Sequence, residues 1–223
     1  MEFIEYADAE LMMMDLANRL AGELRQALAG GARASLAVPG GTTPGPVFDS
    51  LSGADLDWAR VDVLPTDERW VPETSERSNA RLIRARLLTD RAAAARFVPL
   101  YAPAERPEDR LADLAEGVAA VLPLSVLLLG MGEDMHVASL FPGAEGLQAA
   151  LQGEAPVAAI RAPGLPEARV TLTAPVLRDA MQRHLVITGA AKRRALEAAR
   201  QMAPEEAPVA AVLRGTVVHW AEA

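Results

Sequence analysis

The 223-residue chain contains no cysteine, and no hydrophobic run is long enough for a membrane span. Without cysteine, neither a disulfide nor a thiolate metal site can form. The longest apolar stretch, Val118–Gly132, is interrupted by Pro123 and Ser125, and it falls short of the roughly 20 apolar residues that a span requires. The N-terminal segment is acidic, whereas a signal peptide begins with positive charge. We therefore expect a cytoplasmic protein that enters no membrane.

Positive charge is also scarce. The chain has 22 Lys and Arg against 30 Asp and Glu, so its formal net charge is -8. A general nucleic-acid binder needs a broad basic face, so we expect no nucleic-acid partner. Hydrophobic residues make up 51% and charged residues 23%, which is typical of a globular protein. We expect one domain over residues 1–223.

Short apolar runs alternate with helical patterns along the chain. The runs that predict strands are Phe3–Tyr6, Ala34–Val38, Val61–Leu64, Leu124–Leu129, Val157–Ile160, Val170–Thr173, Leu185–Thr188 and Thr216–Trp220. The predicted helices are Asp8–Leu28, Ser78–Leu88, Pro107–Leu122 and Gly189–Met202, with Asp8 and Ser78 as N-caps. Strands as apolar as Leu124–Leu129 are buried on both faces. The pattern predicts a Rossmann-like, doubly wound α/β fold, with a mostly parallel sheet and helices on both faces.

In such folds ligands bind at the carboxyl ends of the strands, so the loops there are the candidate site. After Ala34–Val38 comes Pro39-Gly40-Gly41-Thr42-Thr43, ahead of a predicted helix. Paired glycines before a helix favour an anion-binding nest, although a plain tight turn has the same pattern. The loop is not a Walker A motif, because Pro46 stands where that motif requires lysine.

The loop after Leu124–Leu129 carries Gly130, Gly132, Asp134 and His136. A histidine there is accessible, and a carboxylate two residues away can orient it as a general base near pH 7. A dinucleotide fingerprint would need glycine at Met135, and one histidine with two acids is no firm metal set. We therefore expect neither a cofactor nor a metal. No Gly-x-Ser-x-Gly motif occurs, which argues against a serine nucleophile.

Three cations also lie near predicted strand ends. Arg69 belongs to the Thr66–Pro72 loop, a charged segment that by itself is more typical of solvated surface, and Arg169 precedes the strand at Val170. Lys192, the single lysine of the chain, lies in the first turn of a helix. A cation opposes the helix dipole there, so a bound anion would explain it; chance placement and codon bias remain alternatives.

Four segments in order resemble the 6-phosphogluconolactonase family. They are Pro39–Pro44, Asp67–Pro72, Gly130–Pro142 and Arg169–Thr173. The Ser78-Asn79 pair and Lys192 also fit, and the resemblance runs from about residue 36 to about residue 200. It implies hydrolysis of 6-phosphogluconolactone to 6-phosphogluconate in the oxidative pentose phosphate pathway, without a cofactor, on a fold shared with aminosugar-phosphate deaminases.

The resemblance also implies roles for individual residues. His136 would be the general base that activates water, with Asp134 beside it. The residues that would hold the phosphate are Gly40, Gly41, Thr42, Arg69, Arg169 and Lys192. Asp67, Gly130 and Gly132 would complete the substrate site, with N–H groups near Gly130–Gly132 polarising the lactone carbonyl.

The sequence departs from the family at Met135, where the family usually has glycine. If this position requires a positive φ, a methionine costs roughly 1 kcal/mol or more. Two alternatives stay open. A glucosamine-6-phosphate deaminase would have glutamate at Phe141 and tyrosine at Arg69. A sugar-phosphate-sensing domain would need an attached DNA-binding module and no base at His136.

Overall fold

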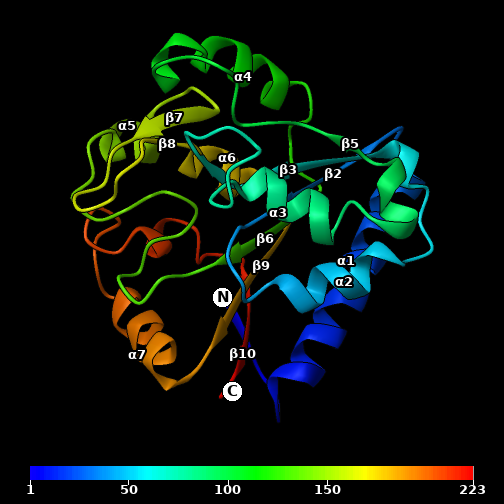
Figure 1. The fold of residues 1–223 in the computed structure, drawn as a ribbon. Helices are drawn as coiled ribbons and strands as arrows, with labels where there is room; N and C mark the ends of the chain where they lie inside the picture. The colour runs from blue at the N-terminus through cyan, green and yellow to red at the C-terminus, as the bar shows by residue number, and fades with distance from the viewer. Residues whose placement is uncertain (223) are drawn as a thin grey trace.

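Seven parallel strands form the centre of the molecule, in the order β1-β10-β9-β6-β2-β3-β5 (Figure 1). The computed structural model describes residues 1–222. The strands are β1 (Glu2–Glu5), β2 (Ala34–Val38), β3 (Val61–Pro65), β5 (Arg96–Phe97), β6 (Val126–Gly130), β9 (Gln182–Thr188) and β10 (Val217–Ala221). Every neighbouring pair is parallel. The predicted α/β fold with a mostly parallel sheet is therefore confirmed.

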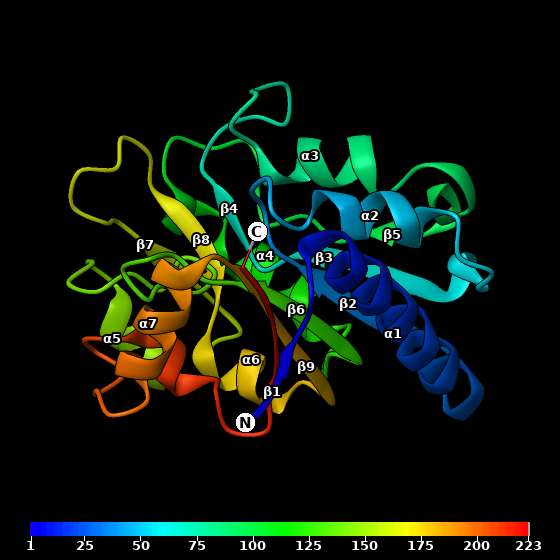
Figure 2. The ribbon, with the colours of Figure 1, turned by 90° about the horizontal axis from the view of Figure 1, so that it is seen from below.

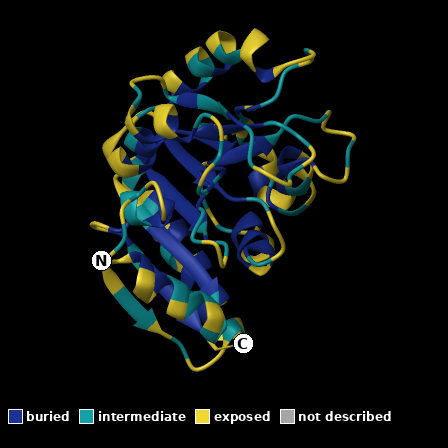
Figure 3. Cartoon of the chain, turned by 90° about the vertical axis from the view of Figure 1, so that its left-hand side faces the viewer, coloured by how far each residue is buried: buried dark blue, intermediate teal, exposed yellow. Residues whose placement is uncertain are grey.

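Helices cover both faces of this sheet (Figure 2). One hydrophobic core contains residues of α1 (Ala9–Gly30), α2 (Gly45–Ser52) and α3 (Asn79–Arg86). The other contains residues of α4 (Leu111–Ala119), α5 (Leu147–Gln152), α6 (Ala174–Asp179) and α7 (Ala190–Ala199). Alternate residues of β6 join opposite cores, because successive side chains of a strand point to opposite faces. The inner strands β2, β3 and β6 are accordingly buried over nearly their whole length, whereas the edge strands β1 and β5 are partly exposed (Figure 3).

Local capping explains where several helices begin. Asp8 accepts a hydrogen bond from the Leu11 N–H at 2.7 Å, and Ser78 accepts one from the Arg81 N–H at 3.2 Å, as predicted for N-caps. Pro107, by contrast, opens a short 3-10 turn, and α4 begins only at Leu111. The other 3-10 turns are Trp58–Arg60, Asp90–Ala94 and Pro208–Ala211. No helix among residues 1–222 is long and apolar enough to cross a membrane.

A second, antiparallel sheet of three strands lies beside the carboxyl end of β3. It contains β4 (Asp67–Arg69), β8 (Arg169–Leu172) and β7 (Val157–Ile160), in that order. The prediction of a loop at Asp67–Arg69 is therefore wrong. A three-residue polar strand carries no periodicity, and pairing with β8 is what makes it a strand.

The order of the strands creates a crevice between β2 and β6. From β2 the chain continues outward through β3 and β5, whereas β6 begins the series that leads through β9 to β10 on the other side. The loops that follow β2 and β6 therefore diverge at this point. Ligands of open α/β sheets bind at such a switch point.

Candidate active site

A cleft of about 150 Å³ lies at this switch point. It is lined by Pro39, Gly40, Gly41, Asp67, Arg69, Asn79, Gly130, His136, Ala138 and Arg169. Most of the residues predicted for the site thus come together, from the loops after β2 and β6 and from the small sheet. The predicted residues that are not among the lining residues are Thr42, Gly132, Asp134 and Lys192.

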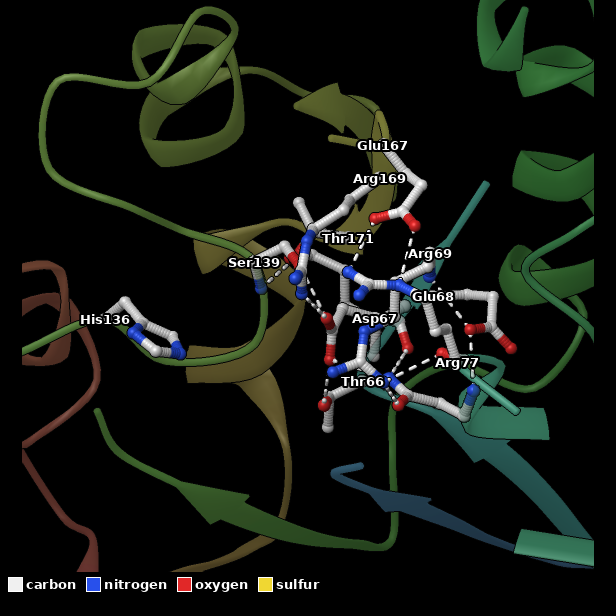
Figure 4. Close-up of polar contacts among 12 residues, drawn as sticks. Thr66, Asp67, Glu68, Arg69, Arg77, His136, Ser139, Glu167, Arg169 and Thr171 are labelled. Atoms are coloured by element: carbon white, nitrogen blue, oxygen red, sulfur yellow. Dashed lines mark hydrogen bonds and ion pairs between the residues drawn. The ribbon is translucent and has the colours of Figure 1, made fainter. Parts of the chain in front are cut away.

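His136 is held by a tight loop after β6. Its Nδ1 lies 2.5 Å from Oδ1 of Asp134, and the side chain of His136 is 30% exposed. Because a carboxylate only accepts hydrogen bonds, Nδ1 carries the hydrogen of a neutral imidazole, and Nε2 keeps its lone pair. The loop provides an accessible, oriented base at the edge of the cleft (Figure 4).

Gly132 serves this loop by its small size. A Cβ at Gly132 would lie 2.3 Å from the His136 ring and 2.4 Å from Asp134, so a larger residue would displace the pair. Its N–H donates to the His136 carbonyl at 3.0 Å. This N–H is therefore already used within the loop, and the expectation that it polarises a substrate carbonyl is not supported.

The loop after β2 approaches the cleft through its two glycines. A Cβ at Gly40 would lie 2.0 Å from Oδ1 of Asn79, and Gly41 has φ +86. Both positions therefore require glycine, the first for space and the second for conformation. Thr42 is exposed, and its carbonyl accepts a hydrogen bond from the Gly45 N–H at 3.1 Å.

Asp67 and Arg69 lie on β4, and Asn79 connects them. Asn79 donates to the Asp67 carbonyl at 2.8 Å and accepts from Arg69 at 2.6 Å. Asp67 is buried, and its Oδ2 accepts a hydrogen bond from Ser139 at 2.5 Å. Asn79 and Ser139 are thus site residues that sequence reasoning missed. The Ser78-Asn79 pair of the family resemblance was the available signal for Asn79.

Arg169 lies opposite Arg69, because β4 and β8 pair these two residues. It is 8% exposed and lies 3.6 Å from Asp67. Burial lowers the pKa of Arg169; the charge of Asp67 raises it, and that of Arg69 lowers it further. The Nε atoms of both arginines are buried with no hydrogen-bond partner among the described residues. Both arginines line the cleft, so the pair presents two cations there.

Glu68 ties this strand to the start of α3. Its carboxylate is fully buried and accepts from the N–H groups of Arg69, Asn79 and Ala80 and from the Ser78 hydroxyl, at 2.7–3.0 Å. Burial raises the pKa of Glu68, and these four donors oppose the shift. The contacts fix the backbone of Asn79, whose side chain in turn holds Asp67 and Arg69.

Two further observations bound the site. The described residues contain no group of three or more His, Asp or Glu side chains that could hold a metal ion. A larger cavity, of about 620 Å³, lies at the opposite edge of the sheet and is lined by residues such as Ser35, Asp62 and Ser125 near the amino ends of the strands. It contains neither His136 nor the arginine pair.

Fold and cleft together define an α/β protein with a pocket that is lined by two arginines and by a carboxylate-oriented histidine. The chain belongs to the family described as glucosamine-6-phosphate isomerases/6-phosphogluconolactonase, whose model matches residues 7–220. The resemblance drawn from the sequence motifs is thereby confirmed.

Known relatives are similar over nearly the whole chain. A 6-phosphogluconolactonase of Pseudomonas aeruginosa is 44% identical over 92% of this chain and 88% of its own length. One of Rhizobium meliloti is 44% identical, with 92% of each chain covered. The crystal structure of a 6-phosphogluconolactonase from Shewanella baltica has a TM-score of 0.95, at 32% identity over 99% of this chain and 97% of that one.

Proposed function

We propose that the protein hydrolyses 6-phosphogluconolactone to 6-phosphogluconate, a step of the oxidative pentose phosphate pathway. The observation that carries the proposal is the cleft, which is lined both by the Asp134-oriented His136 and by the cations Arg69 and Arg169. The relatives that bear this enzyme's name support it, as they are similar over nearly the whole chain. The reaction requires no cofactor.

In the proposed mechanism, Nε2 of His136 takes a proton from water as its oxygen attacks the lactone carbonyl. The tetrahedral intermediate collapses, the ring C–O bond breaks, and the imidazolium returns the proton to the departing oxygen. Asp134 stabilises the imidazolium between these steps, through its contact with Nδ1. The new acid then loses its proton to solvent.

The two arginines hold the phosphate in this proposal. A charge-assisted hydrogen bond contributes about 1.5–3 kcal/mol, and Arg69 and Arg169, which both line the cleft, suit an anion. The glycines at 40 and 41 complete the phosphate subsite. Anchoring the phosphate positions the carbonyl near His136, so binding energy contributes to the chemical step.

The test measures acid release from freshly prepared 6-phosphogluconolactone above its spontaneous hydrolysis. We expect the wild type to accelerate it, and His136→Ala to lose a factor of about 10²–10⁴ in kcat while keeping its fold. Glu133→Gln, an exposed change in the same loop, is the matched control and should keep full activity. A wild type without activity would refute the proposed reaction, whereas an active, folded His136→Ala would refute only the base.

A further inference from the structure

Phe141 contacts both chemical groups of the cleft, although it does not line the cleft itself. Its ring centroid lies 4.3 Å from that of His136, with 33° between the ring planes. The Arg169 guanidinium carbon lies 5.1 Å from the same phenyl centroid. Phe141 is 8% exposed and packs in the core formed with α4 to α7.

We propose that Phe141 is a positioning residue that fixes His136 and Arg169 relative to one another. The inference rests on the proposed function, in which His136 activates water and Arg169 holds the phosphate. A lactone anchored by its phosphate presents its carbonyl at a set distance from that anchor. The base must therefore stand at a matching distance from the cation, and Phe141 contacts both.

The imidazole needs this support because its ring has one hydrogen bond among the described residues, from Nδ1 to Asp134. Gly132 also lies against the ring, but it has no side chain that could hold the ring plane. The loop that carries the ring lies at the surface, and Asp134 itself is 55% exposed. Packing against a buried phenyl ring restricts the imidazole plane and hence the direction in which Nε2 points.

The Arg169 guanidinium also needs the contact with Phe141, because its polar contacts are weak. Arg169 meets Asp67 at 3.6 Å and Ser139 at 3.5 Å, both long contacts, and its strand neighbour Arg69 repels it. A phenyl face carries partial negative charge and attracts a cation held over it. Phe141 thus adds an attractive surface for a buried cation whose direct ion pair is loose.

The experiment compares Phe141→Leu with Phe97→Leu. Phe97 is the matched control, because Arg84 lies 4.5 Å over its ring in β5, outside the cleft. Two substrates are used, 6-phosphogluconolactone and unphosphorylated gluconolactone. We expect Phe141→Leu to lower kcat about 10- to 100-fold on both lactones and to raise KM only for the phosphorylated one.

Two companion variants separate positioning from folding. Phe141→Tyr keeps the ring and should keep kcat within about threefold of wild type, since the tilted aromatic contact with the imidazole persists. If Phe141→Leu does not fold, Phe141→Met replaces it, because a flexible thioether side chain fills a similar space. Unchanged kinetics in a folded ring-deleted variant, or losses no greater than in Phe97→Leu, would overturn the proposal.

A readout independent of activity keeps this inference separate from the proposed function. In the wild type, the carbon-bound ring protons of His136 should show a phenyl ring-current shift in NMR spectra, and inorganic phosphate should bind. Phe141→Leu should remove the shift and weaken phosphate binding, while Phe97→Leu leaves both unchanged. If the wild type hydrolyses no lactone, the proposed function fails, yet these two measurements still decide whether Phe141 positions the pair.

Discussion

Met135, which stands where the sequence motif of the family has glycine, adopts a left-handed backbone conformation. Its φ is +66, in the left-handed region that residues with a Cβ disfavour. Its N–H donates to the Gly132 carbonyl at 3.0 Å, and its carbonyl accepts from the Val209 N–H at 3.0 Å. These contacts hold the backbone in place, so the methionine bears the strain and the loop keeps its shape.

Comparing Met135→Gly with Met135→Ala isolates this strain. Both changes remove the side chain, but only glycine relieves the positive φ. We therefore expect Met135→Gly to be more stable than Met135→Ala by about 1 kcal/mol, measured by chemical unfolding. Equal stability of the two variants would show that the left-handed conformation costs nothing here.

Lys192 stays a prediction as a phosphate ligand. It lies in the first turn of α7 and is partly exposed, and its side chain makes no hydrogen bond or ion pair with the described residues. If it reaches the phosphate, Lys192→Ala should raise KM for 6-phosphogluconolactone by about tenfold or more and leave unphosphorylated gluconolactone unaffected. Arg194→Ala, an exposed neighbour in α7, is the control. A similar effect on both lactones would refute the assignment.

At the scale of elements, the joint between β4 and α3 organises one wall of the cleft. Glu68 caps the start of α3 with its carboxylate, and the negative charge also suits the positive end of a helix. The side chain of Asn79, the first residue of that helix, then contacts both Asp67 and Arg69. The positions of Asp67 and Arg69 in the cleft therefore depend on Glu68, which does not itself line the cleft.

Replacing Glu68 by glutamine tests this dependence. An amide accepts with one oxygen, so at least one buried donor loses its partner, at about 1–3 kcal/mol for each. We expect Glu68→Gln to lower the free energy of unfolding by that amount and to raise KM through displaced Arg69. Glu73→Gln is the control, because Glu73 pairs with Arg84 on the surface. Wild-type stability and KM in Glu68→Gln would contradict the argument.

The same joint shows what the sequence could and could not predict. Caps such as Asp8 and Ser78 act within three residues, so both helix starts were predictable from local pattern. The apolar β6 was predictable too, since burial on both faces leaves a compositional trace. Glu68 looked solvated because its partners, apart from its neighbour Arg69, are ten to twelve residues away. The pairing of Arg69 with Arg169 spans 100 positions and has no local signal at all.

At the scale of the whole molecule, the charge of -8 opposes the approach of an anionic substrate. Local positive charge offsets this repulsion, because Arg69 of β4 and Arg169 of β8 lie together at the switch point between β2 and β6. The sequence motifs predicted Arg69 and Arg169 separately as site residues. Their convergence depends on strand order, which only the folded sheet determines.

A chain of hydrogen-bonded polar side chains joins α1 to strands β9 and β10. His219 in β10 contacts the Tyr6 hydroxyl at 2.9 Å and His184 in β9 at 3.0 Å, and His184 contacts Glu23 of α1 at 2.8 Å. Both histidines are buried. Burial, with the neighbouring His184, lowers the pKa of His219 from 6.5 to about 3.

This shift makes the stability of the whole molecule depend on pH. Above pH 6.5, His219 is neutral in both the folded and the unfolded chain. Between pH 6.5 and about 3, the unfolded chain binds a proton that the folded chain does not. The free energy of unfolding should therefore fall with acidity, by up to about 1.4 kcal/mol per pH unit from this group.

Chemical unfolding at a series of pH values from 8 to 4 measures how steeply the free energy of unfolding depends on pH. His219→Gln should flatten this dependence, because glutamine does not titrate. Val218→Ala, a buried change in the same strand, should lower stability at every pH and keep the wild-type slope. Equal slopes in His219→Gln and wild type would show that His219 does not set the acid sensitivity.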